Sequence, residues 1–483
     1  ILNFGQQAFA YTPPTGYKAL SSANLPDPTI LLPNKHFNTL LYTGSNSSSL
    51  YNVTGLEFQP DWVWGKSRND TIGHILFDAV RGEDRQLEAN VTDAEVVRGS
   101  AAYRFLSNGF AVSTVGNLNN PVNYVAWNWN AGDTDGKTYT VKVVSDGGNK
   151  YRFDDFGTSA VTLDLAEGGT YVFDQSDSSN ATHPLRFYTA ADKTGGEYTT
   201  GVTTSGTAGS SGATVTITIA ASAPTLYYQC SAHAGMGGQV NTNSTLGSSN
   251  FDGTIQTITK VNASAGFSIV TYTGNNASAT IGHGLGVAPN VVIIKRRNGT
   301  GDWIIGHDGL ASNAFANNKF LKFTTNTTFT NSLVFGSQPT SSVVQIVTGS
   351  GATNLNGSSD TYVMYCFSEV AGYSKFGSYT GNGSSDGTFV FTGFRPAWVM
   401  VKKSSGSDSW LIMDNKRDID NVVGNTLAAN SSGAENADTG GIPTDFLSNG
   451  FKCRGSGGDF NGNGATFVYL AFAESPFKNA RAR

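Results

Sequence analysis

The sequence has few cysteines, few charges and no long hydrophobic run, and each shortage excludes a class of protein. Three cysteines in 483 residues, Cys230, Cys366 and Cys453, are too few for a disulfide framework, so packing must hold the fold together. Charged residues make up 14% of the chain, and the net charge is −5 without a long run of either sign. Nucleic acid is therefore not an expected partner, because its binding needs a basic surface. Membrane insertion is not expected either, since no apolar run reaches the roughly 20 residues of a membrane helix.

The chain is rich in residues that form turns and short strands. Glycine accounts for 58 residues, and Ser, Thr and Asn are plentiful, whereas no long helix-forming stretch of Ala, Glu, Lys and Leu occurs. Aromatic residues make up 11% of the chain and are distributed throughout, which argues against disorder. This composition predicts an all-β protein of several domains.

One module of roughly a hundred residues occurs three times in the chain. The shared segments are Tyr-Thr-Gly at 42–44, 272–274 and 379–381, and Phe-Leu-Ser-Asn-Gly-Phe at 105–110 and 446–451. Each copy closes on a strand with alternating apolar residues, as at Tyr124 to Trp129, and this alternation is typical of a β-sandwich sheet. Repetition extends a chain and its surface, whereas catalysis usually needs one unrepeated pocket.

The repeats divide the chain into five expected segments. These are the end of a preceding domain with a linker at 1–34, module 1 at 35–133, a different domain at 134–248, module 2 at 249–371 and module 3 at 372–483. The chain starts at Ile1 without a methionine, so we expect a natural N-terminal part to precede it. The expected fold is all-β: a string of β-sandwich modules with one further sandwich inserted in the series.

The middle domain contains the one group of residues with a clear chemical pattern. Cys230, His233 and Met236 follow a strand in the order Cys-x-x-His-x-x-Met, and His183 lies upstream. A thiolate, two imidazoles and a thioether are the ligands of a blue-copper site. Because the chain has only four Met and six His, the pattern favours a copper site over incidental core packing.

With this motif, and with the strand and loop AEGGTYVFDQSDSSNATHPLRF before it, the middle domain resembles the cupredoxins. The resemblance implies a Greek-key sandwich that binds copper through His183, Cys230, His233 and Met236. Pro184 stands where many electron-carrying members have an Asn that braces the ligand loop. The expected use of the metal is as a structural clip that adds to the folding free energy, with electron transfer as the alternative.

Two further patterns recur in the modules. Asp78 is followed by Arg81, and Asp414 by Arg417, and each pair is predicted to be a buried or turn-bracing ion pair rather than a catalytic one. Five tryptophans recur at strand positions with polar alternates, as glycan-stacking rings would: Trp62, Trp64, Trp127, Trp129 and Trp398. Trp62, Trp64 and Trp398 are the candidates for a glycan site, with core packing as the alternative.

Several longer stretches carry a second resemblance: YTGNGSSDGTFVFTGFRPAWVMVKK at 379–403, FVYLAFAESPF at 467–477 and the repeated FLSNGF. Through them the modules resemble repeats in tail-fibre and other virion structural proteins of marine tailed bacteriophages. The opening ILNFGQQAFAYTPPTGYKAL is similar to the C-terminal end of a SPRY (concanavalin-like) domain. The resemblance implies a structural virion protein, a fibre or surface appendage that mediates host attachment from the virion surface.

The partners that this resemblance implies are other virion proteins, a host surface glycan or protein receptor, and further copies of the chain, since such fibres are often trimeric. No enzymatic activity is expected, because the sequence offers no Ser-His-Asp order, paired carboxylates or zinc-type His cluster. Two alternatives stay open: a secreted bacterial surface adhesin, and a copper redox protein of the electron-transfer type.

Overall fold

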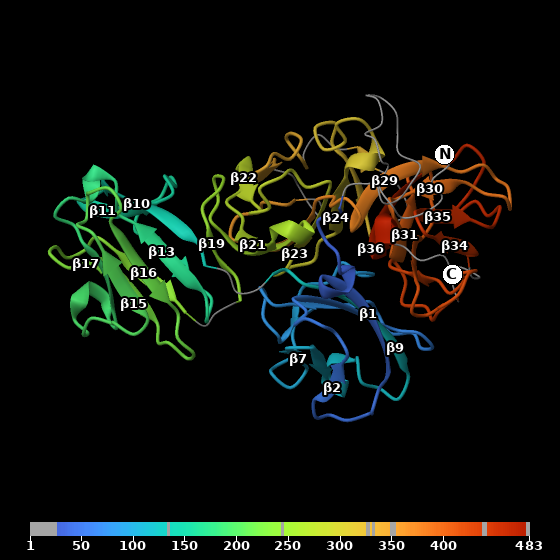
Figure 1. Ribbon diagram of the computed structural model, residues 1–483, viewed down its shortest axis with the longest axis horizontal. Helices are drawn as coiled ribbons and strands as arrows, with labels where there is room; N and C mark the ends of the chain where they lie inside the picture. The colour runs from blue at the N-terminus through green and yellow to red at the C-terminus, as the bar shows by residue number, and fades with distance from the viewer. Residues whose placement is uncertain are drawn as a thin grey trace, which may run out of the picture.

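The computed structural model describes residues 27–132, 136–242, 246–324, 329–330, 334–347, 354–436 and 442–479. Within these residues the regular structure consists of strands and single-turn 3-10 helices, which confirms the all-β fold class. The three modules group together, and the middle domain, called here the insert domain (136–242), extends to one side (Figure 1). The stretch that is similar to a SPRY domain lies outside the described residues.

Module 1 consists of two antiparallel sheets that face each other. Its strands are β1 (Phe37–Thr43), β2 (Tyr51–Thr54), β3 (Trp62–Ser67), β4 (Ile75–Asp78), β5 (Arg85–Glu88), β6 (Val96–Val97), β7 (Tyr103–Leu106), β8 (Gly109–Val112) and β9 (Asn123–Trp129), with 3-10 helices η2 (Pro33–Lys35) and η3 (Thr114–Gly116). The large sheet has the order β1-β9-β3-β4-β5-β6 and the small sheet the order β2-β8-β7. Val63, Phe77 and Phe110 belong to the core between the two sheets.

Modules 2 and 3 repeat this plan. The strands of module 2 are β19 (Ser248–Asn250), β20 (Thr257–Asn262), β21 (Phe267–Thr273), β22 (Ala279–Gly282), β23 (Val291–Arg296), β24 (Trp303–His307), β25 (Lys319–Lys322), β26 (Phe329–Thr330), β27 (Val343–Ile346) and β28 (Thr361–Phe367). Those of module 3 are β29 (Ser374–Thr380), β30 (Phe389–Phe391), β31 (Phe394–Lys403), β32 (Trp410–Asp414), β33 (Leu427–Ala428), β34 (Thr444–Leu447), β35 (Gly450–Cys453) and β36 (Thr466–Pro476). Their 3-10 helices are η6 (Ala263–Ala265), η7 (Asp308–Leu310) and η9 (Phe477–Asn479). The orders β21-β28-β23-β24-β25 and β29-β36-β31-β32-β33 match β1-β9-β3-β4-β5, so the sequence repeats share one topology.

The repeated Tyr-Thr-Gly triplet has one structural role in all three modules. Its tyrosine hydroxyl donates to a backbone carbonyl: Tyr42 to Leu118 (2.8 Å), Tyr272 to Leu355 (2.8 Å) and Tyr379 to Phe460 (2.7 Å). Its ring stacks on an aromatic ring of the closing strand: Tyr42 on Tyr124, Tyr272 on Tyr362 and Tyr379 on Phe467. A buried asparagine follows each accepting residue: Asn119, Asn356 and Asn461. The repeat therefore preserves one tyrosine-asparagine clamp, which joins the first strand of the shared order (β1, β21 or β29) to the segment before the last strand of the module (β9, β28 or β36).

Replacing Asn461 with Ala is expected to destabilise module 3 by about 2 kcal/mol, because the change leaves buried polar groups without partners. The Asn461 Oδ1 atom accepts from the Asn382 backbone N–H at 3.0 Å, and its Nδ2 atom donates to the Ser384 carbonyl at 2.8 Å. The measurement is urea unfolding followed by tryptophan fluorescence. The exposed neighbour Asn463 is the control, and its replacement with Ala should change the free energy of unfolding by less than about 0.5 kcal/mol. Equal effects of the two substitutions would rule out the clamp.

The outer faces of the three large sheets bury one another in a common core. Alternation along β9 directs Val125, Trp127 and Trp129 to this core and Tyr124 and Ala126 to the core of module 1 itself. All seven tryptophans of the chain lie in the common core: Trp62, Trp64, Trp127, Trp129, Trp303, Trp398 and Trp410. The modules in series therefore form one body around a shared interior, in which both faces of each large sheet are buried.

Contacts between equivalent positions repeat around this core. In each module one ring lies just before or at the start of β4, β24 or β32, the equivalent strands of the three large sheets. This ring approaches the backbone of a neighbouring module. The Trp303 indole donates to the Glu88 carbonyl (2.9 Å) and the Trp410 indole to the Lys322 carbonyl (2.9 Å), and the equivalent ring of module 1, His74, lies near the Ala428 backbone. These contacts run from module 2 to 1, from 3 to 2 and from 1 to 3. We infer an approximately threefold arrangement within one chain.

The insert domain is a separate two-sheet sandwich. Its strands are β10 (Thr138–Ser145), β11 (Asn149–Phe153), β12 (Leu163–Asp164), β13 (Thr170–Asp174), β14 (Leu185–Tyr188), β15 (Val202–Ser205), β16 (Thr214–Thr218), β17 (Leu226–Cys230) and β18 (Gly238–Asn241), with 3-10 helices η4 (Ser178–Asn180) and η5 (Ala191–Lys193). The sheets have the orders β11-β10-β13-β16-β15 and β12-β18-β17-β14.

The insert domain is joined to module 2 through β19. This strand pairs with β20, while Phe251 just after it belongs to the core of the insert domain. The Tyr139 hydroxyl of the insert domain also donates to the Ser249 carbonyl at 2.8 Å. The expected boundary between residues 248 and 249 therefore falls inside a strand that serves both domains.

Candidate metal centre

Three of the four predicted ligands converge at one end of the insert domain. The Cys230 Sγ atom lies 3.8 Å from the Nδ1 atom of His183 and 3.5 Å from the Nδ1 atom of His233. The two imidazole rings have centroids 4.6 Å apart. In the part of the chain that the structure describes, this is the group of His, Cys and acidic side chains with the spacing to hold a metal ion.

The spacing of the ligand atoms fits a single metal ion. Bonds of about 2.0–2.3 Å from nitrogen and sulfur, meeting near about 120°, would place the donor atoms roughly 3.7 Å apart. The measured Sγ–Nδ1 separations of 3.5 and 3.8 Å agree with this value. Both histidines present their Nδ1 atom to the sulfur, so two imidazole nitrogens and one thiol sulfur are available to a His₂Cys set. The residues present therefore fit copper.

Met236, the fourth predicted ligand, lies at the end of the loop that follows β17. Its side chain is 1% exposed and belongs to the same apolar cluster as Cys230. The Tyr151 backbone N–H donates to its carbonyl at 2.9 Å, which ties the loop to β11. The thioether is thus buried in the same core as the Cys230 thiol, at the end of the loop that carries His233.

The backbone of His183 is fixed on both sides. Its N–H donates to the Asn180 carbonyl at 2.8 Å, and its own carbonyl accepts from the Tyr151 hydroxyl at 2.8 Å and the Gln175 amide at 3.0 Å. Thr182 before it has a φ of 68°, in the left-handed region that a threonine seldom adopts. This strained turn brings the imidazole over the end of β17, where Leu185 pairs with Cys230.

Burial favours the neutral, ligand form of His183. Desolvation, and then the neighbouring His233, lower the pKa of His183 below its ordinary value. A neutral imidazole has a lone pair for a metal. The Asn149 side-chain amide lies 3.4 Å from the other ring nitrogen, and such a partner orients a ligand ring.

The sequence pattern did not reveal the residues that support the ligands. Tyr151 and Asn149 come from β11, and Gln229 and Asp192 bind the ligand loop. Gln229 directly precedes Cys230, the first residue of the motif, and this adjacency was the one feature of the sequence that could have pointed to a supporting role. The others are distant in sequence, and only the fold brings them to the site.

The tryptophan candidates for glycan stacking are corrected by the structure. Trp62, Trp64 and Trp398 are each 1% exposed and belong to the common core of the three modules. A ring that is closed in by neighbouring modules cannot stack on a sugar. Their strand neighbours Val63 and Val399 are buried in the cores of modules 1 and 3, so both faces of these strands are closed to solvent.

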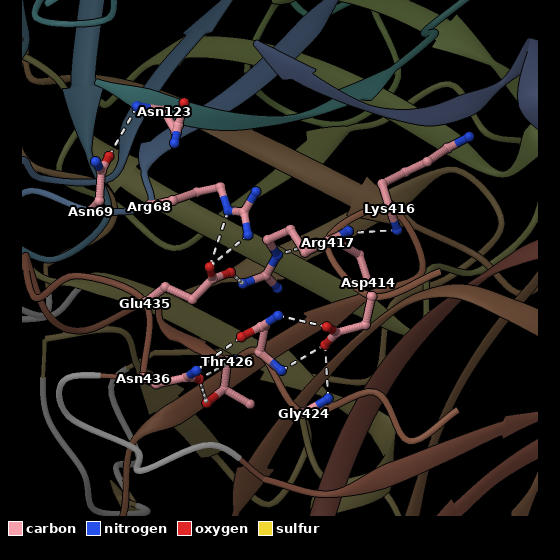
Figure 2. A network of polar contacts seen from close by, with 12 residues as sticks. Arg68, Asn69, Asn123, Asp414, Lys416, Arg417, Gly424, Thr426, Glu435 and Asn436 are labelled. Carbon is pink, nitrogen blue, oxygen red and sulfur yellow. Dashed lines mark hydrogen bonds and ion pairs between the residues drawn. The ribbon is translucent and has the colours of Figure 1, made fainter. Parts of the chain in front are cut away.

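The recurring Asp-Arg pairs are buried ion pairs, as predicted. Asp414 binds Arg417 at 2.6 Å, and Arg417 also binds Glu435 at 2.9 Å (Figure 2). Glu435 in turn binds Arg68 of module 1 at 2.8 Å. The Asp414 carboxylate also accepts from the Trp127 indole at 3.1 Å. The pair therefore joins modules 1 and 3 and is not exposed for catalysis.

The same network recurs between modules 1 and 2. Arg81 pairs with Asp78 and Glu95, Glu95 pairs with Arg297 of module 2, and the Tyr365 hydroxyl donates to Asp78 at 2.7 Å. Module 2 has His307 where the other modules have the aspartate, and its Nε2 atom lies 3.1 Å from the Tyr469 carbonyl of module 3. Each interface is thus closed by a polar group at the same position.

Fold and site together define a multi-module β-sandwich protein with a His-Cys-His cluster in an inserted domain. The chain belongs to the family described as Domain of unknown function (DUF7483), whose model matches residues 32–153 and 240–476. A comparison with curated proteins and one with solved structures each found no match. The four predicted ligands lie between the two matched ranges, so the candidate metal centre is outside the matched part of the chain. None of the helices that the structure describes is long and apolar enough to span a membrane.

Proposed function

We propose that the chain is a structural, non-enzymatic protein whose insert domain binds copper through His183, Cys230, His233 and Met236. The observation that carries the proposal is the approach of two imidazole Nδ1 atoms to one thiol at separations that suit a shared metal. A buried thiol close to two imidazoles, with a buried thioether at the end of the same loop, favours copper among the common metals. When bound, copper supplies a cross-link between the loop before β14 and the loop after β17.

Titration of the whole chain with Cu(II) is expected to give an intense visible charge-transfer band and a higher melting temperature of the insert domain. Replacing Cys230 with Ser should abolish the band, because the thiolate is its source. Cys366→Ala is the matched control: it removes another fully buried cysteine, at a position where module 3 has Ala471, and should leave the band unchanged. A wild-type chain without the band would contradict the copper site.

We also propose that the three modules serve as a rigid scaffold in a virion appendage that mediates host attachment. The support is the sequence resemblance to bacteriophage fibre repeats, together with the burial of all three large sheets in one body. A secreted adhesin and an electron carrier are the competing functions. Antibodies against the chain should label the outer surface of particles and block adsorption to the host. Labelling confined to bacterial cell surfaces would favour the adhesin.

A further inference from the structure

The loop between β17 and β18 is held in place by several hydrogen bonds to other parts of the insert domain. The Ser231 N–H donates to the Pro184 carbonyl, and Lys193 and Lys150 donate to the carbonyls of Ser231 and Gly235. The loop contains two of the predicted ligands, His233 and Met236. Its course is therefore determined by side chains that are not ligands.

Gln229 makes the largest number of these bonds with a single side chain. Its Oε1 atom accepts from the backbone N–H groups of Met236 and Gly237, both at 3.1 Å. Its Nε2 atom donates to the Asp192 carboxylate at 3.3 Å. Gln229 is 4% exposed, and because strand residues alternate it lies on the face opposite Cys230. One amide thus connects the residue beside the thiol with the backbone of the methionine.

Asp192 also holds the ligand loop, and its own backbone is strained. Its Oδ1 atom also accepts from the Gly235 N–H at 3.2 Å, and it has a φ of 50°. The next residue, Lys193, which holds the Ser231 carbonyl, has a φ of 65°. Two consecutive non-glycine residues in the left-handed region cost free energy, and such strain persists where the surroundings impose it. Here both side chains are turned to the ligand loop.

We propose that Gln229, oriented by Asp192, is a positioning residue that fixes the backbone of Met236 and so would position its thioether for a bound metal. Gln229 lies on β17 next to Cys230, so the amide that holds the end of the ligand loop comes from the strand that carries the thiol. This inference rests on the proposed copper site. The hydrogen bonds of Gln229 and Asp192 give the ligand loop its conformation in the metal-free protein.

The test compares Cu(II) affinity and the visible spectrum of the whole chain with those of Gln229→Leu. The substitution removes all three hydrogen bonds of the amide at similar size. We expect a 10- to 100-fold loss of copper affinity, typical of lost partners around metal ligands, and a shifted charge-transfer band. Gln239→Leu on β18 is the matched control, because that amide donates to Asn241 and not to the loop. It should change the affinity less than twofold.

A second pair of variants decides the question if Gln229→Leu does not fold. Asp192→Asn keeps an oxygen acceptor for Gly235 and should resemble the wild type, whereas Asp192→Ala should shift the band in the direction of Gln229→Leu. Hydrogen exchange of the Met236 amide in metal-free protein gives a readout without copper, and Gln229→Leu should accelerate it at least tenfold. Wild-type affinity, spectrum and exchange in Gln229→Leu would overturn the inference. If the wild type lacks the charge-transfer band but its Met236 amide still exchanges more slowly than that of Gln229→Leu, only the copper site is overturned.

Discussion

Replacing Arg417 with Met is expected to lower the free energy of unfolding of the three-module body by about 3–5 kcal/mol. The guanidinium is buried and binds Asp414 at 2.6 Å, Glu435 at 2.9 Å and the Ile412 carbonyl at 2.9 Å. Desolvation opposes the charge of Arg417, but the two carboxylates prevail and raise its pKa above the ordinary value. Without the cation, Asp414 remains buried beside the Trp127 indole with its charge uncompensated.

The measurement is chemical unfolding followed by tryptophan fluorescence, which reports on this body because all seven tryptophans lie in its common core. Lys416→Met is the matched control: it removes a neighbouring cation whose side chain is exposed, and should cost less than about 0.5 kcal/mol. Arg81→Met should resemble Arg417→Met, because Arg81 occupies the same position between modules 1 and 2. A loss below about 1 kcal/mol for Arg417→Met would show that the network adds little to stability.

The architecture of each module was readable from the sequence. Alternation along Tyr124 to Trp129 predicted a strand of a β-sandwich sheet, and Val125, Trp127 and Trp129 do share one face of that strand. The repeated Asp-Arg pair was correctly predicted to be an ion pair, since a buried charge needs a partner at short range. Both features depend on local spacing, which a single sequence displays.

The arrangement of the modules was not readable, because it depends on contacts far apart in the chain. Trp127 donates to Asp414, and Tyr365 to Asp78, each across a sequence separation of 287 residues. Alternation shows that a strand has two faces, but it does not show whether the second face meets water or another module. For this reason Trp62, Trp64 and Trp398 remained open to a surface role.

The candidate metal centre shows the same division between local features that the sequence reveals and distant contacts that it does not. The order Cys-x-x-His-x-x-Met brought Cys230 and His233 together, since one short loop carries both. The place of His183 required β14 and β17 to pair, which the sequence did not specify. The supports Asp192 and Tyr151 come from outside the motif, and their roles follow only from the folded positions of η5 and β11.

Acid is expected to weaken the contact between modules 2 and 3 through His307. Its Nδ1 atom accepts from the Gly309 N–H at 2.9 Å and its Nε2 atom faces the Tyr469 carbonyl at 3.1 Å, so the neutral ring satisfies both contacts. Burial lowers the pKa of His307 to about 4, although the Tyr469 carbonyl acts in the opposite direction. A histidine in the unfolded chain takes up a proton near pH 6.5, so the unfolded state binds protons first as the pH falls. Stability from this residue is complete above pH 6.5 and decreases by about 3 kcal/mol on the way to pH 4.

His307→Gln isolates this contribution, because the amide can accept from Gly309 and donate to Tyr469 without titrating. Urea unfolding followed by tryptophan fluorescence at pH 7 and pH 4 should show a loss about 3 kcal/mol smaller in the variant than in the wild type. His36→Gln, which changes a half-buried histidine, should alter the pH dependence much less.

His74 lies at the interface of modules 1 and 3, and burial, with Lys66, holds its pKa well below the ordinary value. His74→Gln should therefore also reduce the loss of stability between pH 7 and pH 4. Parallel curves of unfolding free energy against pH for the wild type and His307→Gln would contradict this prediction. Because an unfolded histidine is protonated at pH 4, such curves would mean that His307 is also protonated in the folded protein. His307 would then be solvated and not buried between the modules.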